Sequence, residues 1–323
     1  MSEPIVSVKN AVKTFQVNGM GGKKLVHAIN DVSFDIYPGE TFSLVGESGC
    51  GKSTTGRLIN HIITPDSGQV LLDGKDITHI SEKEMRPLRK NVQMIFQDPY
   101  GSLNPRIKIQ DQIGEPLLLH TNLSAGERLQ KVQKLLGQVG LSASHGERYP
   151  HEFSGGQLQR VGIARAISVE PKIIIADEPV SALDVSIQAQ VLNLMKKLQE
   201  EMKLTYLFIS HDLSVVEMIS DRIAVMYLGT IVEIADKRDL YQKPVHPYTR
   251  ALLSAVPVPD PTVKKTRTIL QGDIPSPVHL PTGCLFHTRC PHCTEQCCKE
   301  VPPMTDFGNG HIVRCHFAKQ FAE

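Results

Sequence analysis

The sequence predicts an α/β protein with a mainly parallel β-sheet and helices on its faces, and three observations support this fold class. Short apolar stretches that favour strands alternate with longer stretches of helical periodicity, as in proteins built on parallel sheets. The run from Gly46 to Thr54 fits the pattern G-x-x-x-x-G-K-[ST] of a phosphate-binding loop, and it lies between a predicted strand and a predicted helix. A second apolar strand, Ile173 to Ala176, ends in the carboxylates of Asp177 and Glu178.

Composition limits the class of protein further. The 323 residues suffice for a large core plus an appendage, and the formal net charge of +1 gives no overall field that would attract nucleic acid. No apolar run approaches the roughly 20 residues that span a bilayer. The start, Met1 to Pro4, lacks the basic and apolar segments of a signal peptide. We therefore expect a cytosolic chain, and docking on membrane proteins stays open.

The first hundred residues favour strands on both sides of the phosphate-binding loop. Val6 to Lys9 alternates apolar and polar residues like an edge strand, and Val26 to Ile36 resumes this alternation after a Gly- and Lys-rich hairpin tip at Gly19 to Lys24. Thr41 to Val45 is a buried strand, and the helix after the loop begins at Thr54. Further strands are expected at 69–72 and 91–96.

From Ile107 to Tyr149 the pattern is helical. Ser124 is a predicted N-cap of a helix from Ala125 to Gly140, and Glu127 three residues later completes a capping box. The remaining core alternates between predicted helices at 158–168 and 185–202 and predicted strands at 172–176, 205–209, 222–227 and 231–234.

The pattern changes after residue 235, where we place a boundary between a domain of residues 1–235 and a C-terminal region of residues 236–323. A helical piece is expected at Arg238 to Gln242, and Pro257 to Pro261 is typical of a linker. From Gln271 onward the chain is rich in Pro and Cys and has little periodicity, so residues 272–323 form a small Cys-rich extension beyond a second, softer boundary near 270.

The phosphate-binding loop has residue types suited to a polyphosphate. Its glycines let consecutive backbone N–H groups turn toward an anion, and the following helix adds the positive end of its dipole. Lys52 supplies a mobile cation for the β- and γ-phosphates, and the hydroxyl of Ser53 is a ligand for Mg²⁺. The alternative, a glycine-rich turn that fits the pattern by chance, is disfavoured by the strand–loop–helix setting.

Asp177 and Glu178 suit the same chemistry. Asp177 ends a buried strand, where it binds Mg²⁺ directly or through water, and Glu178 is placed to polarise an attacking water molecule. Adjacent carboxylates repel each other, so the pKa of one is raised unless a metal ion neutralises the other. The alternative is a strand end with two solvated acids.

The chain resembles the ATP-binding subunits of ABC transporters, which are P-loop NTPases. Ser154-Gly155-Gly156-Gln157 matches their signature motif, with Phe153 where Leu is more usual. Gln97, Ser181 to Asp184 and His211 fill the other family positions, and the resemblance covers residues 4 to about 235. It implies an antiparallel β subdomain, a helical subdomain at about 98–168, and ATP held between two chains that pair head to tail.

The resemblance also implies roles for individual residues. Glu178 and His211 orient the attacking water, and Gln97 senses Mg²⁺ and contacts the membrane subunits. Ligands for Mg²⁺ are Ser53, Gln97 and Asp177. Phe15 matches an aromatic residue that stacks on adenine, although a core Phe is nearly as good an interpretation. The implied ATP-binding positions are Phe15, Gly46, Glu47, Ser48, Gly49, Cys50, Gly51, Lys52, Ser53, Thr54, Ser154, Gly155, Gly156, Gln157 and Asp184.

Two segments outside these motifs are similar to dipeptide and oligopeptide importers. They are Tyr100 to Arg106, after Gln97, and His246 to Leu253, and the pairs Gly283-Cys284 and Arg289-Cys290-Pro291 add to the similarity. The likeness extends nearly end to end to the second ATPase subunit, the F-type, of these importers.

This likeness implies an assembly: a homologous second ATPase subunit, two transmembrane permeases and an extracytoplasmic solute-binding protein, with this chain peripheral at the cytoplasmic face of the membrane. Nucleic acid is not among the expected partners. Members of the family also import nickel or glutathione, so the solute stays open. Alternatives from other classes are a soluble ABC ATPase acting on nucleic acid or ribosomes, and a scaffold that binds nucleotide without turnover.

Six of the seven cysteines fall in the last 40 residues. Cys284, Cys290, Cys297 and Cys315 match a pattern that holds a [4Fe–4S] cluster in some members of the subfamily, and four thiolates also satisfy tetrahedral Zn²⁺. Reduced thiols without a metal are the third interpretation. The ligand set is open, because Cys293, Cys298 and several histidines lie nearby: His287, His292, His311 and His316.

Overall fold

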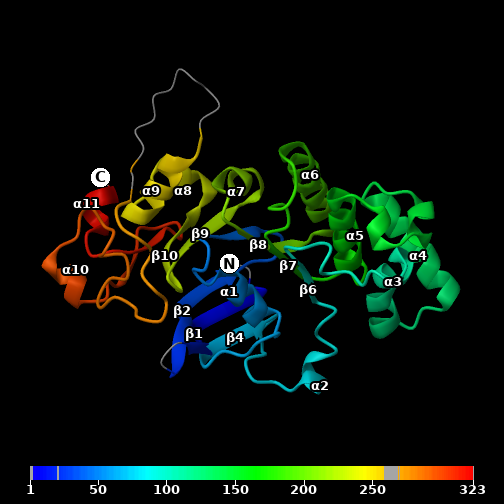
Figure 1. The fold of residues 1–323 in the computed structure, drawn as a ribbon, viewed down its shortest axis with the longest axis horizontal. Coiled ribbons are helices and arrows are strands. Elements are labelled where there is room, and N and C mark those ends of the chain that lie inside the picture. Colours follow the sequence, from blue (N-terminus) through cyan, green and yellow to red (C-terminus); the bar gives the residue numbers. More distant parts are fainter. Residues whose placement is uncertain (1–2, 20–21, 258–267, 269, 323) are drawn as a thin grey trace.

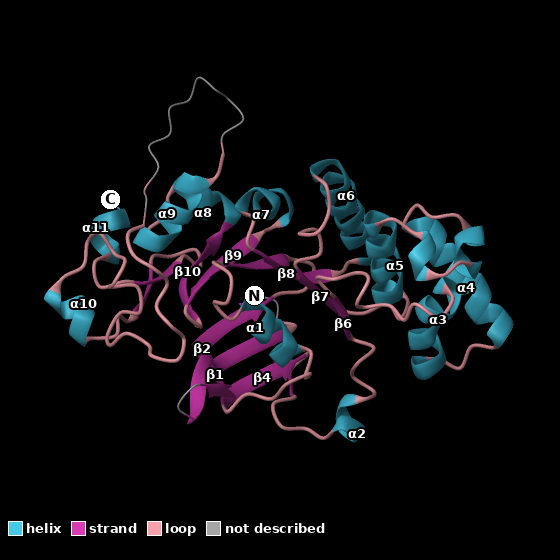
Figure 2. Ribbon diagram, in the orientation of Figure 1, coloured by secondary structure: helices cyan, strands magenta, loops and turns pink. Residues whose placement is uncertain are grey.

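The computed structural model describes residues 3–19, 22–257, 268 and 270–322, and two β-sheets organise it (Figures 1 and 2). The larger sheet has the strand order β11-β12-β10-β9-β3-β8-β7-β6. Its parallel part consists of β9 (Arg222–Tyr227), β3 (Thr41–Val45), β8 (Thr205–Ser210), β7 (Ile173–Asp177) and β6 (Val92–Ile95). Every residue of β3, β7 and β8 is buried, as expected of parallel strands covered on both faces. The predicted fold class is thus confirmed.

The smaller sheet is antiparallel, as the resemblance implied. Its order is β2 (Gly22–Ile36), β1 (Val6–Gly19), β4 (Ser67–Leu72) and β5 (Lys75–Asp76). Helix α1 (Lys52–Ile59) contacts strands of both sheets. Gly56 permits this packing, because a Cβ at that position would lie 2.9 Å from Cδ1 of Ile209 and 3.0 Å from Cγ2 of Ile175.

The two faces of the larger sheet pack into separate cores. Along β8, Leu207 and Ile209 face the core shared with α1 and the small sheet, whereas Tyr206 and Phe208 face the core formed with the other helices. This alternation follows from the two-residue period of a strand. Strand β3, which precedes the phosphate-binding loop, likewise contributes Val45 to one core and Leu44 to the other.

Helices fill the chain between β6 and β7, the region predicted as a helical subdomain. They are α3 (Ile109–His120), α4 (Ala125–Gln138) and α5 (Gly155–Ile167), and short 3₁₀ turns precede α5. Ser124 caps α4, and the capping box with Glu127 is present as predicted. The remaining core helices are α2 (Glu82–Met85), α6 (Val185–Met202) and α7 (Leu213–Ile219).

The C-terminal region joins the core instead of standing apart. Helices α8 (Lys237–Gln242), α9 (Pro247–Ala255), α10 (Glu295–Lys299) and α11 (Ala318–Ala322) accompany two strands that were not predicted, β11 (Met304–Asp306) and β12 (Ile312–Arg314). Strand β12 pairs with β10 (Thr230–Asp236) and so extends the large sheet. The predicted boundary near 235 falls at the end of β10 and stays a prediction.

Two predicted segments are only partly described. The linker at 257–261 lies, apart from Pro257, outside the described residues, and the hairpin tip at 19–24 includes residues 20 and 21, which also lie outside them. Within the part of the chain that the structure describes, no helix combines the length and apolarity required to span a membrane.

Candidate nucleotide-binding site

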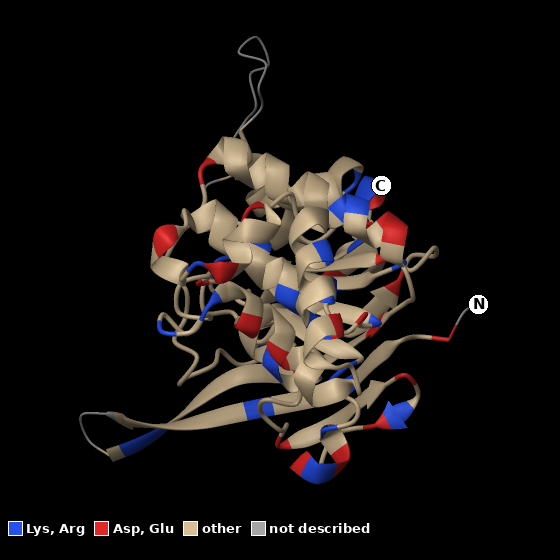
Figure 3. Ribbon diagram, turned by 90° about the vertical axis from the view of Figure 1, so that its right-hand side faces the viewer, with Lys and Arg blue, Asp and Glu red and all other residues tan. Residues whose placement is uncertain are grey.

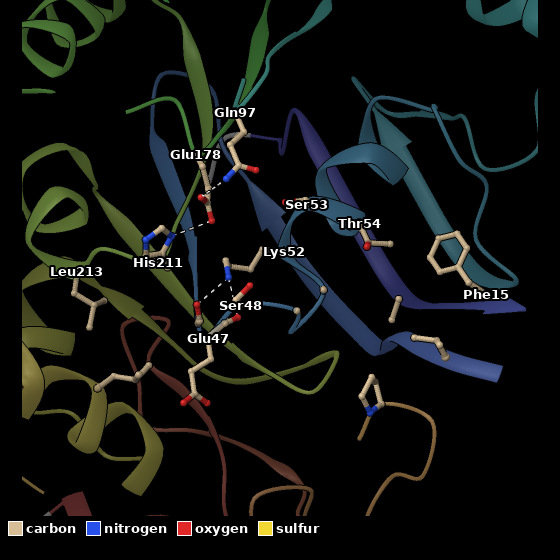
Figure 4. A pocket seen from close by; sticks show the side chains of 17 residues that line it. Phe15, Glu47, Ser48, Lys52, Ser53, Thr54, Gln97, Glu178, His211 and Leu213 are labelled. Carbon is tan, nitrogen blue, oxygen red and sulfur yellow. Dashed lines mark hydrogen bonds and ion pairs between the residues drawn. The ribbon is translucent and has the colours of Figure 1, made fainter. Parts of the chain in front are cut away.

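A cavity of about 750 Å³ lies over the phosphate-binding loop, between β3 and α1 (Figure 4). Most of the loop lines it, together with residues from distant parts of the chain. The predicted site residues on its wall are Phe15, Gly46, Glu47, Ser48, Gly49, Gly51, Lys52, Ser53, Thr54, Gln97, Glu178 and His211. The fold thus brings together residues that are far apart in the sequence.

The loop holds its own lysine in place. Nζ of Lys52 donates to the carbonyl oxygens of Gly46 at 2.8 Å and Glu47 at 3.0 Å. Gly51 has φ 106°, and a Cβ there would lie 2.2 Å from the carbonyl oxygen of Ala28, so only glycine fits. These two bonds hold the buried Lys52 at the wall of the cavity, where its ammonium group can reach a phosphate.

Ser53 lines the cavity and contacts Asp177, which does not itself line it. The hydroxyl of Ser53 donates to Oδ1 of Asp177 at 2.7 Å. Burial raises the pKa of Asp177, the charge of Glu178 adds to the rise, and the hydrogen bond from Ser53 together with nearby Arg57 opposes it. A hydroxyl and a carboxylate in contact are oxygen donors of the type that Mg²⁺ prefers, so these residues fit the ion.

Glu178 is the centre of a second set of contacts. Its Oε2 accepts a hydrogen bond from Nε2 of Gln97 at 2.8 Å, and its Oε1 lies 3.0 Å from Nδ1 of His211. Figure 4 shows the two side chains converging on the carboxylate from different elements. Glu178 has φ 47°, an uncommon left-handed conformation for a glutamate, immediately after β7.

The remaining predicted ATP-binding positions do not line this cavity. Ser154 caps α5 and forms a capping box with Gln157, while Gly155 and Gly156 occupy the first turn. Asp184 precedes α6 and is exposed. Cys50 is buried, and its thiol packs under Gly46 rather than toward the cavity.

Sequence reasoning missed several residues of the cavity wall. Val26, Ala28, Leu213, Leu252 and Pro277 line it, although none belongs to a phosphate-binding pattern. Leu252 and Pro277 come from the C-terminal region, and the carbonyl of Pro277 accepts the N–H of His27 at 2.9 Å. These apolar contacts have no local sequence signal, since they arise only when distant segments pack together.

The predicted metal site in the cysteine segment is not supported. Among the described residues, no group of three or more His, Cys, Asp or Glu side chains is arranged to hold a metal ion. Burial raises the pKa of Cys284, Cys290 and Cys315, and the charges of neighbouring cysteines add to the rise. Sγ of Cys297 contacts the hydroxyl of Thr294 at 3.6 Å. Sγ of Cys293 and Sγ of Cys298 lie 3.8 Å apart.

Comparison with known proteins assigns the family. Residues 29–181 match the family model described as "ABC transporter", and residues 232–297 match "Oligopeptide/dipeptide transporter, C-terminal region". The dimeric post-hydrolysis structure of the ATP-binding cassette MJ0796 bound to ADP and Pi is 30% identical, with a TM-score of 0.66 over 72% of this chain and 99% of that one. The fold is thus that of an ABC ATPase.

Relatives that match nearly the whole chain indicate a more specific group within the ABC ATPases. The oligopeptide transport ATP-binding protein AppF of Bacillus subtilis is 52% identical over 97% of both chains. The di/tripeptide transport ATP-binding protein DppF of Pseudomonas aeruginosa is 49% identical over 99% of both chains. This chain belongs to the ABC transporter family, as one of its ATP-binding proteins, and it is an ATPase.

Proposed function

We propose that this chain is the ATP-hydrolysing subunit of an importer of dipeptides and oligopeptides, held at the cytoplasmic face of the membrane. The observation that carries the proposal is the contact of Glu178 with both Gln97 and His211 over an intact phosphate-binding loop. The names of the two full-length relatives and the match of residues 232–297 support peptides as the solute.

Catalysis then consists mainly of positioning and charge neutralisation. The backbone N–H groups of the loop and the ammonium of Lys52 bind the phosphates of ATP. Glu178 accepts a hydrogen bond from the attacking water, and His211 holds that water together with Glu178. Ser53 and Asp177 would hold Mg²⁺, with Gln97 as a further ligand, and the ion would supply positive charge to the phosphoryl oxygens.

A second ATPase chain completes the site in this proposal. Ser154 to Gln157 and Asp184 lie outside the cavity lined by Lys52 and Glu178, so within one chain they do not reach the same nucleotide. The first turn of α5 still presents free N–H groups and a dipole end suited to a γ-phosphate. A head-to-tail pair, here with a homologous subunit, would bring it to the ATP of the partner.

Permeases have a candidate docking groove on the helical side of the molecule. A cavity of about 320 Å³ is lined by Phe96, Pro116, Leu119 and Arg165, among others, and the side chains of Phe96 and Leu119 are 41% and 55% exposed. Phe96 immediately precedes Gln97, so movement in this groove reaches Glu178 through one hydrogen bond. Figure 3 shows acidic and basic residues interspersed over this side, which favours apolar contacts over purely electrostatic attachment.

Uptake measurements test the solute. We expect a strain without this subunit to lose uptake of a labelled dipeptide or tripeptide and to regain it with the wild-type gene. Uptake of nickel and glutathione should be unchanged in the same strain. Loss of either of these, with peptide uptake intact, would assign the chain to the alternative importer of a different small solute.

A metal cluster would be an addition to this function, and only the matching cysteine pattern supports it. The chain purified without chelators would contain iron if the cysteines ligate a cluster, zinc if they form a tetrahedral site, and neither metal if the thiols are unliganded. Elemental analysis checks this, and a broad visible absorption together with iron would restore the [4Fe–4S] interpretation.

A further inference from the structure

The C-terminal region holds the phosphate-binding loop by the side chain of Glu47. Nη1 and Nη2 of Arg289 donate to Oε2 of Glu47 at 2.8 Å and to Oε1 at 3.2 Å, in a bidentate pair. The hydroxyl of Tyr248 donates to the same carboxylate at 3.3 Å and accepts the backbone N–H of Glu47 at 3.1 Å. Figure 4 shows the Glu47 carboxylate directed away from Lys52. Its partners therefore come from outside the nucleotide cavity.

These contacts are shielded from solvent. The side chain of Arg289 is 7% exposed and that of Glu47 is 27% exposed, and the guanidinium lies 5.9 Å from the ring centroid of Tyr227. Charge-assisted bidentate pairs are stronger and more directional than ordinary hydrogen bonds, and partial burial reduces their screening by salt. Removal of one partner leaves the other charge partly buried without compensation.

Glu47 in turn sets the position of Lys52. The backbone carbonyl of Glu47 accepts a hydrogen bond from Nζ of Lys52, and the adjacent Gly46 accepts another. The loop also contains Gly49 and Gly51 with positive φ, which make it conformationally permissive. A loop ordered before ATP arrives loses less entropy on binding, so an external restraint on Glu47 favours affinity.

The restraint begins inside the cysteine segment. Arg289 precedes Cys290, and its backbone N–H donates to the carbonyl of Phe286 at 3.0 Å. The ring of Phe286 is buried against Tyr248 and Tyr227, the two tyrosines next to the ion pair. The segment and the loop thus form one packed unit, although the residues of the pair are 242 positions apart.

We propose that Arg289, with Tyr248, is a positioning residue of the ATP site: the C-terminal region fixes Glu47 and thereby holds the phosphate-binding loop and Lys52 in the conformation that binds ATP. The inference deepens the proposed function, since it concerns the same ATP, but it does not depend on which solute is imported.

Binding of a fluorescent ATP analogue to the full-length chain tests the inference. We expect R289M to weaken binding about tenfold or more, E47Q to weaken it similarly, and R289K to lie between R289M and the wild type. The double variant E47Q/R289M should bind the ATP analogue no more weakly than whichever single variant has the lower affinity. The reason is that the two substitutions remove the same restraint. In the assembled complex, R289M should raise KM for ATP and leave kcat within about twofold.

Arg314→Met is the matched control. Arg314 also joins the C-terminal region to the N-terminal part of the chain, through Oδ2 of Asp31 at 3.0 Å, but neither residue lines the nucleotide cavity. R314M should leave ATP affinity unchanged. Circular dichroism verifies that each variant is folded, and E47Q and R289K keep the test decisive if R289M does not fold.

Three results overturn the inference. The first is an ATP affinity within about twofold of wild type in R289M or, if that variant is unfolded, in E47Q. The others are equal losses of ATP affinity in R289M and R314M, and additive losses of ATP affinity in the double variant. The proposed function fails separately. A wild-type chain that binds ATP but whose complex does not respond to peptide would overturn the importer assignment alone, whereas a wild-type chain that binds no ATP would overturn both.

Discussion

At the scale of single residues, the site is a set of side chains that contact one another. Ser53 forms a hydrogen bond with Asp177. Glu178 forms hydrogen bonds with Gln97 and His211, and Lys52 donates hydrogen bonds to carbonyl groups of its own loop. The chemistry proposed for these residues therefore predicts specific losses when one is changed.

Glu178→Gln is the most informative change at the catalytic centre. The amide keeps the size of the side chain and its contacts, but it no longer accepts a proton from water. We expect ATP binding within about twofold of wild type and a loss of ATP hydrolysis of at least about 100-fold in the assembled complex. Hydrolysis assays with and without the complex partners check this, and unchanged turnover would remove Glu178 from its role.

The burial of His246 predicts how the stability of the fold depends on pH. Full burial lowers the pKa of His246 to about 4, an effect that the nearby Glu233 opposes, while its Nδ1 accepts the N–H of Tyr248. Because the folded-state pKa lies below the unfolded value of about 6.5, the unfolded chain binds the extra proton first. The free energy of unfolding therefore decreases as pH falls from about 6.5 to about 4, and His246 accounts for up to about 3 kcal/mol of this decrease.

The variant H246N checks the sign of this effect. Asparagine is also a good N-cap, so α9 keeps its cap. Glu233 and His311, which face each other beside His246, are present in both proteins. Urea unfolding at pH 7 and pH 5 should show a smaller loss of stability in H246N than in the wild type, and equal losses would contradict the assigned pKa.

At the scale of elements, helices α4 and α5 begin with the same kind of capping box, but different functions are proposed for them. Ser124 accepts the N–H of Glu127 at 3.4 Å on α4, and Ser154 accepts the N–H of Gln157 at 3.4 Å on α5. As caps, the two serines are matched. Only Ser154 belongs to the segment proposed to contact the ATP of a second chain.

Substitution of each serine by alanine separates the two roles. Both S124A and S154A should lose about 1 kcal/mol of stability in urea unfolding, because each loses a cap. S154A alone should lower ATP hydrolysis of the assembled complex by about tenfold or more. Equal activity of the two variants would argue against a contact between α5 and a second ATP.

The same comparison of elements shows what the sequence could predict. The helix Val185–Met202 and the strand Arg222–Tyr227 agree with prediction to the residue. The helix is long and amphipathic, and the strand is a short apolar run bounded by polar and turn residues. β11 and β12 are three residues long, too short for any period, and β12 pairs with β10 through residues such as Glu233 and Val313. Such pairing is decided by tertiary packing.

At the scale of the whole molecule, the sequence predicted the residues of the phosphate-binding motifs better than the residues that pack around them. Local patterns identified Lys52, Asp177 and Glu178, since their spacing follows from strand–loop–helix geometry. The contact between Arg289 and Glu47 has no such pattern, and neither has the approach of Pro277 to the cavity. The segment Ser154 to Gln157 caps and opens α5 and does not line the cavity, so its predicted contact with ATP stays a prediction.

The most direct test of the account is ATP hydrolysis by the complete importer in proteoliposomes. The complex contains this chain, its ATPase partner, both permeases and the solute-binding protein. We expect hydrolysis to rise severalfold when the binding protein is loaded with a dipeptide or oligopeptide, and the rise to vanish in a complex that carries E178Q. Hydrolysis that does not respond to peptide, or a response that survives in E178Q, would contradict the account.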